Sequence, residues 1–218
     1  MRSSDERRAP IPHVSLAPFT TLGVGGEARW FASVQSVEAL ESALRWADAQ
    51  ALPIEVIGGG SNVVIADRGV EGLVLRVAMA GVAFHEAEQG CLVRAGAGEP
   101  WDGVVQRVVE RGLAGLECLS GIPGTVGGTP VQNVGAYGQE VSDTIRAVTA
   151  FDRTTGALTT IAATDCGFAY RTSRFKTVDR GRFVICDVTY ALRGELAAPA
   201  YPDVREALAR AEIGRAHV

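Results

Sequence analysis

The sequence predicts an α+β protein, built around one sizeable core or two small subdomains that share an interface. Short segments rich in β-branched residues, bounded by glycine or proline, are typical of strands, and two longer segments have the apolar spacing of amphipathic helices. The 218 residues are 47% hydrophobic and 21% charged, which is an ordinary globular composition. A chain of 218 residues is long enough to bury one sizeable core or two small ones.

The first half of the chain predicts a small unit of strands around one helix. Residues 1–17 contain two prolines and little apolar periodicity, so we expect a mobile or extended lead-in outside the first subdomain. Ser36 is a suitable N-cap for a helix whose apolar residues run from Val37 to Ala47 at helical spacing. Strands are expected at residues 52–57 and 73–77. We assign residues 18–77 to a first subdomain.

The second half predicts a larger unit, residues 78–195. Pro100 suits the first turn of a helix that carries valines on one face and ends before Gly112. Strands are expected at residues 82–87, 91–95, 145–152, 157–161 and 182–192, and the first two and the next two form hairpins by their turn residues. From residue 196 to 211 the apolar spacing predicts the start of another helix.

Charge and hydropathy exclude several partners. The formal net charge is −4, and no face rich in lysine or arginine is visible, so a nucleic-acid partner is not expected. Apolar runs are shorter than the roughly 18 residues that a membrane span needs. Residues 1–8 are charged and precede no apolar segment, which excludes a secretory signal. We therefore expect a cytoplasmic protein without a membrane partner.

Cysteines and histidines give no metal pattern. The four cysteines, at positions 91, 118, 166 and 186, are scattered among apolar or small residues, so we expect reduced packing residues and not disulfides. His13 and His85 have no neighbouring ligand in sequence. No metal site is predicted.

Two uncharged glycine-rich stretches predict a ligand site. Residues 119–138 hold six glycines and two prolines, and Gly58–Asn62 follows the strand expected at 52–57. Glycine lets backbone N–H groups approach an anion or a flat ring, and nearby polar side chains can complete the contacts. A tight turn between buried elements would explain one such cluster, but not so many glycines together. Neither stretch matches a Rossmann fingerprint or a P-loop.

The order and spacing of five motifs resemble one enzyme family. The motifs are Thr21–Gly26, Val56–Asn62, Gly121–Gly128, Gln132–Gln139 and Phe168–Arg171. They are similar to the UDP-N-acetylenolpyruvoylglucosamine reductases (UDP-N-acetylmuramate dehydrogenases), flavoenzymes of bacterial peptidoglycan precursor synthesis and hence of cell-wall growth and division. The resemblance implies a two-subdomain FAD-binding fold of the vanillyl-alcohol-oxidase (PCMH) type, followed by a substrate-capping third domain. Thr20 stands where the family often has asparagine, which leaves that contact open.

The resemblance also implies the reaction and its residues. NADPH gives a hydride to non-covalently bound FAD, and the reduced flavin passes it to the enolpyruvyl group of the UDP-sugar. Arg171 matches the family's catalytic arginine, whose permanent charge and paired donors suit a developing enolate. Tyr170, Gln132 and Asn133 are expected at the substrate, although Tyr170 could equally fill a core edge. FAD contacts are expected at Gly58, Gly59, Gly60, Ser61, Asn62, Ser120, Gly121, Ile122, Pro123, Gly124, Gly127 and Gly128.

The family's proton donor, a serine, and its acidic partner belong to the third domain. We therefore expect this chain to be C-terminally truncated and unable to complete turnover. Residues 212–218 are similar to the translation of a common sequencing adapter, so a non-native tail is expected there. Two alternatives stay open: another FAD-dependent oxidoreductase of the same fold, and a non-catalytic flavin-binding module.

Overall fold

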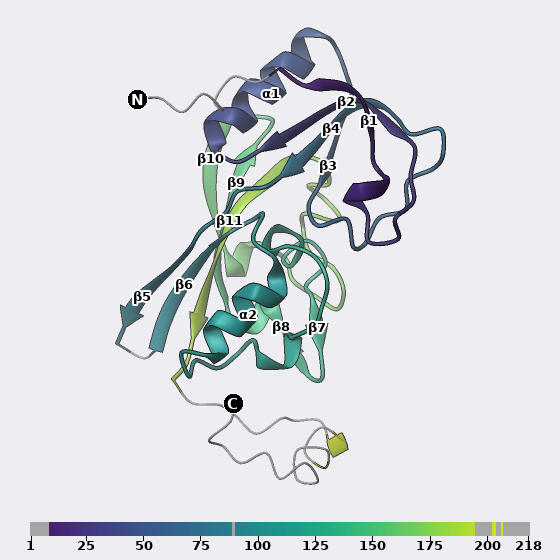
Figure 1. Ribbon diagram of the computed structural model, residues 1–218. Helices are drawn as coiled ribbons and strands as arrows, with labels where there is room; N and C mark the ends of the chain where they lie inside the picture. Colours follow the sequence, from purple (N-terminus) through teal and green to yellow (C-terminus); the bar gives the residue numbers. More distant parts are fainter. Residues whose placement is uncertain (1–8, 89, 195–201, 204–205, 207–218) are drawn as a thin grey trace.

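The computed structural model describes residues 9–88, 90–194, 202–203 and 206. Its first sheet contains, in spatial order, β1 (Ile11–Ser15), β2 (Glu27–Val34), β4 (Val70–Val77) and β3 (Ile54–Ile57). β2 and β3 both run parallel to β4, while β1 is antiparallel to β2. Helix α1 (Val37–Ala49) forms the crossover from β2 to β3 and covers one face of this sheet (Figure 1). Parallel strands need such a crossover.

Strand β1 lies within the segment predicted to be a lead-in. Its residues are mostly exposed, and the side chain of Ile11 is 51% accessible. An edge strand with little burial has no apolar alternation for the sequence to display. The backbone pairing to β2 nevertheless makes it part of the first sheet, which corrects our expectation for residues 11–15.

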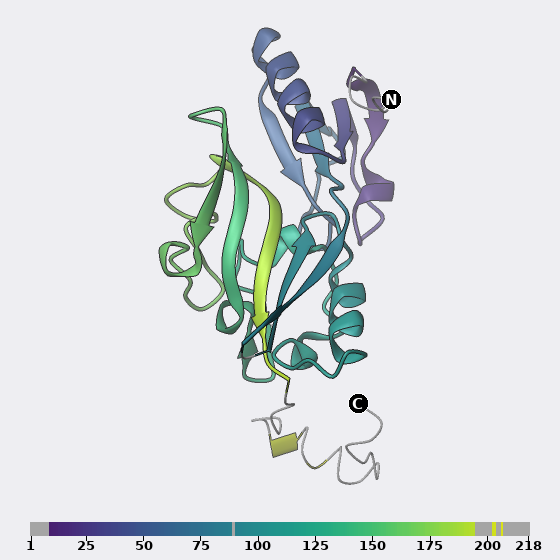
Figure 2. The ribbon, with the colours of Figure 1, turned by 90° about the vertical axis from the view of Figure 1, so that its left-hand side faces the viewer.

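The second sheet is antiparallel throughout. Its strands, in spatial order, are β10 (Ala157–Ala162), β9 (Ile145–Asp152), β11 (Phe183–Leu192), β6 (Gly90–Gly96) and β5 (Val82–Ala87). Both predicted hairpins are confirmed, since β5 pairs with β6 and β9 with β10. Figure 2 shows this sheet beside the first one, with β11 running through its middle.

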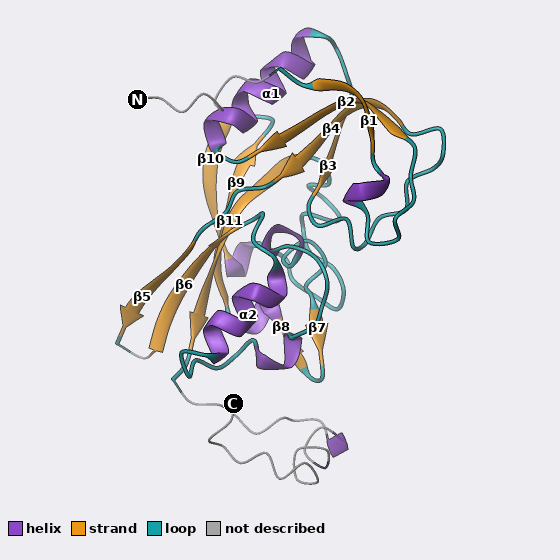
Figure 3. Cartoon of the chain, in the orientation of Figure 1, coloured by secondary structure: helices purple, strands orange, loops and turns teal. Residues whose placement is uncertain are grey.

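Short elements connect the larger ones. Helix α2 (Trp101–Val109) precedes the glycine-rich stretch, which Figure 3 shows mostly as loop. The remaining pieces are the strands β7 (Gly135–Ala136) and β8 (Gln139–Glu140) and the 3-10 turns Ala17–Phe19, Glu117–Leu119, Val126–Gly128, Val141–Asp143 and Ala163–Asp165. Glycine and proline prevent longer regular elements in this stretch.

Both predicted helices form for the reasons their sequences give. The Ser36 hydroxyl accepts a hydrogen bond from the Ala39 N–H at 3.2 Å, which caps α1, and Leu40, Leu44 and Ala47 are buried beneath it. Pro100 occupies the N-cap of α2, whose buried face contains the predicted valines and Trp101. The predicted apolar faces are thus the faces that pack.

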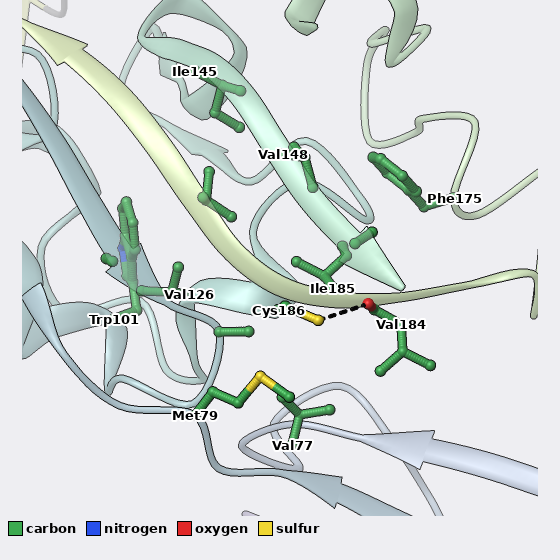
Figure 4. Close-up of a cluster of buried hydrophobic side chains, with 14 of the residues drawn as sticks. Val77, Met79, Trp101, Val126, Ile145, Val148, Phe175, Val184, Ile185 and Cys186 are labelled. Atoms are coloured by element: carbon green, nitrogen blue, oxygen red, sulfur yellow. Dashed lines mark hydrogen bonds between the residues drawn. The ribbon is translucent and has the colours of Figure 1, made fainter. Parts of the chain in front are cut away.

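One hydrophobic core joins the two sheets. Val77 and Met79, from the end of β4 and the segment after it, lie beside Cys186 of β11, and Ile185 belongs to the same buried cluster (Figure 4). The Trp101 ring lies 5.8 Å from that of Tyr190, between centroids. All four cysteines are free thiols, and burial raises the pKa of Cys166 and Cys186 to about 11. Cys166 and Cys186 are buried, as expected of packing residues, whereas Cys91 and Cys118 are partly exposed.

The described residues contain no helix long and apolar enough to span a bilayer, and no cluster of potential metal ligands. Of the helix predicted at 196–211, residues 202, 203 and 206 are described and are helical, whereas the others lie outside the described residues. The tail predicted at 212–218 also lies outside them.

Candidate active site

A pocket of about 410 Å³ opens between the two sheets. Its walls are β3 with the glycine turn that follows it, the stretch from Ile122 to Val134, and the segment from Phe175 to Ile185. Three basic side chains, Arg153, Lys176 and Arg180, line it together with one acidic residue, Glu55. Segments far apart in sequence therefore form one site.

The two glycine-rich stretches meet in this pocket. The Ser61 hydroxyl donates to the carbonyl of Pro123 at 3.1 Å, and the Asn62 amide donates to Gln132 Oε1 at 2.9 Å. A Cβ atom added at Gly59 would lie 2.9 Å from the Cα of Gly124, which is too close for a side chain. Position 59 therefore requires glycine because the two loops lie in contact there.

The Thr20–Thr21 segment contacts the glycine turn Gly58–Asn62. The Thr21 N–H donates to the Gly60 carbonyl at 3.0 Å, and a side chain at Gly60 would clash with the Phe19 carbonyl. The Thr20 hydroxyl donates to the Val24 carbonyl at 2.8 Å. At this position the threonine stabilises its own turn.

Thr125 presents a polar atom without a partner. Its Oγ1 is buried and forms no hydrogen bond within the described part of the chain, although Thr125 lines the pocket. A Cβ on Gly58 would lie only 2.6 Å from this oxygen, so the hydroxyl faces the glycine turn. Unsatisfied buried hydroxyls are rare and call for an explanation. An oxygen-rich ligand at the glycine turn would supply the missing bond.

Ser120 and Gly121 are held away from the pocket by helix α2. The Asp102 Oδ1 atom accepts from the Ser120 hydroxyl at 2.9 Å and from the Gly121 N–H at 2.6 Å. These two bonds, the backbone one first, lower the pKa of Asp102. Neither residue lines the pocket, whereas Ile122, Pro123, Gly124, Gly127 and Gly128 do. The predicted FAD contacts therefore divide into lining residues and two residues that anchor the loop.

Arg171 sits at the tip of a tight turn. Ala169 and Thr172 exchange two backbone hydrogen bonds of 3.1 Å, which leaves Tyr170 and Arg171 at the corner. Tyr170 is 82% exposed, which rules out the core-edge alternative. Arg171 has a φ of 54°, in the left-handed region that non-glycine residues avoid, and its Nη2 donates to the Gly135 carbonyl at 2.7 Å. Its guanidinium is thus fixed in direction.

Asn133 supports this turn instead of lining the pocket. Its side chain is 1% exposed, and its amide nitrogen donates to Glu140 Oε2 at 2.7 Å and to the Ala169 carbonyl at 3.2 Å. Its Oδ1 accepts from the Ser142 N–H at 3.1 Å. The amide is fully used inside the protein. Of the two predicted substrate amides, only Gln132 lines the pocket.

A row of ion pairs secures the segment that carries Lys176 and Arg180. Arg182 makes two hydrogen bonds to the buried Asp152, at 2.7 and 3.1 Å, and also contacts Asp179, which pairs with Arg174 at 2.6 Å. The bonds from Arg182 are the main cause that lowers the pKa of Asp152. Sequence reasoning missed the pocket-lining residues Arg153, Lys176 and Arg180, since only the fold brings them to the pocket.

Comparison with known proteins gives a consistent result. Residues 28–162 match the family described as "FAD binding domain". A UDP-N-acetylenolpyruvoylglucosamine reductase from Thermobifida fusca is 48% identical over 189 residues, covering 86% of this chain and 52% of that protein. The crystal structure of the corresponding enzyme (MurB) from Thermus caldophilus is 30% identical with a TM-score of 0.70, covering 95% of this chain and 71% of that one.

A more distant neighbour shows the fold alone. The structure of 6-hydroxy-D-nicotine oxidase from Arthrobacter nicotinovorans has a TM-score of 0.63 at 20% identity, and covers 88% of this chain and 44% of that one. The chain spans about half the length of the curated relatives that it matches.

Proposed function

Since this chain belongs to the UDP-N-acetylenolpyruvoylglucosamine reductase family, we propose that it binds FAD and takes part in the NADPH-dependent reduction of an enolpyruvyl group on a UDP-sugar. The product would be the UDP-N-acetylmuramate used for peptidoglycan, made in the cytoplasm. The observation that supports this most directly is the meeting of both glycine-rich loops in one pocket, with the Arg171 turn attached to it.

The residues of the pocket fit a flavin nucleotide. The turn Gly58–Asn62 and the unpartnered Thr125 hydroxyl suit phosphate oxygens, because backbone N–H groups and a hydroxyl can bond to them without added charge. The segment Ile122–Gly128 offers a flat, glycine-rich wall for a ring. The described lining contains no histidine or cysteine, which favours non-covalent binding. When bound, FAD would supply the hydride transfer between NADPH and substrate.

Arg171 is the residue that we assign to the reacting group. Its guanidinium stays charged at any working pH and offers donors in one plane, so it can hold a carboxylate and stabilise negative charge on the neighbouring carbon. The bond to the Gly135 carbonyl uses one donor and leaves others for a substrate. Of the expected substrate residues only Gln132 lines the pocket. Tyr170 and Arg171 lie on the turn that Lys176 joins to the pocket lining, and Asn133 acts from beneath that turn.

Stopped-flow kinetics of Arg171→Lys in the full-length gene product tests the proposal. Lysine keeps the charge but loses the planar pair of donors, so flavin reduction by NADPH should stay within about twofold, while reoxidation by the enolpyruvyl-UDP-sugar slows by about ten- to a thousandfold. Arg146→Lys, on the exposed face of β9, is the control and should change neither rate.

Three outcomes would contradict the proposal. Equal slowing of both half-reactions would remove Arg171 from the substrate site. Reoxidation by other acceptors alone would indicate a different oxidoreductase of this fold. Flavin that NADPH cannot reduce would favour a binding module.

A further inference from the structure

Lys176 is the only lysine in the chain, although the sequence has 21 basic residues of the lysine and arginine types. Every other one is arginine. The single exception lies in the pocket lining, four residues before Arg180 and five after Arg171. A chain that uses arginine everywhere else has a lysine at the one basic position that borders both the pocket and the Arg171 turn.

The Lys176 ammonium group holds the backbone at Arg171. Its Nζ donates to the Arg171 carbonyl oxygen at 3.0 Å. Arg171 has the left-handed φ of 54°, and such a conformation at a non-glycine residue persists only where the surroundings fix it. The Arg171 carbonyl therefore accepts a hydrogen bond from Lys176, while the Arg171 guanidinium donates one to the Gly135 carbonyl.

The backbone beneath Lys176 is itself fixed. Its N–H donates to the Ser173 carbonyl at 3.2 Å, and the buried Ser173 hydroxyl donates to the Val131 carbonyl at 2.6 Å. The neighbouring Arg174 is paired with Asp179. The Cα from which the Lys176 side chain starts is therefore held in place. Only the side-chain torsions must be ordered to form the bond to Arg171, at the entropic cost usual for a lysine.

We propose that Lys176 is a positioning residue that keeps the Arg171 turn in its left-handed form and so directs the Arg171 guanidinium. This rests on the function proposed for Arg171. An ammonium group is compact and donates in three directions, so it reaches a carbonyl beside a second cation. A guanidinium is larger and planar, so at position 176 it would have to approach the Arg171 carbonyl in a different geometry.

Amide hydrogen exchange of the FAD-saturated protein tests this without any turnover. The Thr172 N–H, bonded to the Ala169 carbonyl, reports opening of the turn. We expect Lys176→Met and Lys176→Arg to accelerate its exchange by about tenfold or more, because both lose the compact donor. Arg180→Met, which removes another cation from the same pocket lining, is the control and should leave Thr172 unchanged.

The exchange data can overturn the inference in two ways. Unchanged exchange in Lys176→Met would show that the bond does not hold the turn. Thr172 exchange in Lys176→Arg that is as slow as in the wild type would show that a positive charge is enough to hold the turn and that the ammonium group is not required. An FAD dissociation constant raised about tenfold with unchanged exchange would make Lys176 a cofactor ligand instead.

A double-mutant cycle on reoxidation separates positioning from a direct role. Lys176→Met should slow reoxidation by about ten- to a hundredfold with flavin reduction unaffected, and the Lys176→Met/Arg171→Lys double variant should be no slower than Arg171→Lys. Multiplicative losses would mean that the two residues act independently, against the proposal. If the wild-type protein is not reoxidised by the enolpyruvyl substrate, the proposed function fails, and the exchange result still decides whether Lys176 holds the turn.

Discussion

Thr125 and Thr129 carry the same hydroxyl four residues apart, yet only one of them is bonded. Thr129 Oγ1 donates to the Val126 carbonyl at 2.8 Å and lies 3.0 Å from the buried Tyr190 hydroxyl, which it helps to satisfy. Thr125 Oγ1 has no partner within the described residues. We therefore expect opposite effects on the stability of the FAD-free protein when the hydroxyl is removed from Thr125 and from Thr129.

We expect Thr125→Val to stabilise the FAD-free protein slightly or leave it unchanged, because valine removes an unsatisfied buried hydroxyl worth about 1–3 kcal/mol. The same change should weaken FAD binding by about ten- to a hundredfold if the hydroxyl bonds to a charged phosphate. Thermal unfolding of the FAD-free protein and flavin-fluorescence titration measure the two effects.

Thr129→Val is the matched control, and it should destabilise the FAD-free protein by about 1–3 kcal/mol, since it leaves the Tyr190 hydroxyl unpaired. Thr125→Val that binds FAD as tightly as the wild type would show that this hydroxyl does not contact the cofactor.

Gly59 and Gly156 test the glycine turn in the same way. Gly59→Val introduces a branched side chain against Gly124, so it should separate the two loops and reduce FAD affinity by about tenfold or more. Gly156→Ala, in the β9–β10 turn with open space around it but a φ of 70°, should cost only about 1 kcal/mol of stability. Equal flavin affinity of the two variants, measured by titration, would contradict the assignment of the loop.

At the scale of elements, the Arg182–Asp152 pair joins the start of β11 to the end of β9. The pKa of Asp152 is lowered in the folded protein, so its contribution to stability is complete above the unfolded pKa of about 3.9 and is lost as the pH falls through the folded value. Asp152→Asn should therefore lower the melting temperature at pH 7, and the difference from the wild type should shrink below about pH 4.

Circular dichroism across that pH range measures the effect, and Asp48→Asn on the exposed side of α1 provides the control. A difference between Asp152→Asn and wild type that is the same at every pH would show that the charge of Asp152 is not involved.

Most elements with a buried face were predicted, whereas two strands of the first sheet were missed: the exposed edge strand β1, and β2, although its Ala28, Phe31 and Val34 are buried. The valines and Trp101 of α2 repeat at helical spacing because that face packs into the core. The edge strand β1 shows no alternation, since its exposed residues are not selected for burial. Sequence alone predicted both helices and both hairpins of the second sheet for this reason.

The two glycine-rich loops that line the pocket were predictable from the sequence. Glycine content revealed both loops. It could not show that the Ser120 hydroxyl bonds to Asp102 or that Asn133 is buried beneath Ala169, because those partners come from other segments. Arg153 and Lys176 reach the pocket only through the fold, and neither carries a local signal.

At the scale of the whole molecule, the fold is the two-subdomain FAD-binding fold of the vanillyl-alcohol-oxidase type that the resemblance implied. The pocket lies where the two sheets meet, and the loop contacts between Asn62 and Gln132 and between Ser61 and Pro123 cross that boundary. A ligand bound there would contact both sheets at once. Its binding free energy would therefore add to the stability of the whole chain.

We expect FAD to raise the melting temperature of the wild-type chain, because a ligand at about one hundred times its dissociation constant adds about 2.7 kcal/mol to stability. For a domain of this size that corresponds to about 5–10 °C. Asn62→Ala removes the bond to Gln132 and frees the glycine turn, so at the same FAD concentration its increase should be smaller by about half, equivalent to a tenfold weaker affinity.

Scanning calorimetry with and without FAD measures both increases. Gln106→Ala is the control, since Gln106 bonds to Glu110 on the exposed side of α2 and does not line the pocket. This variant should keep the full increase. An Asn62→Ala increase equal to that of the wild type would show that the contact between the loops does not shape the cofactor site, and that the two sheets hold their FAD through the remaining walls of the pocket.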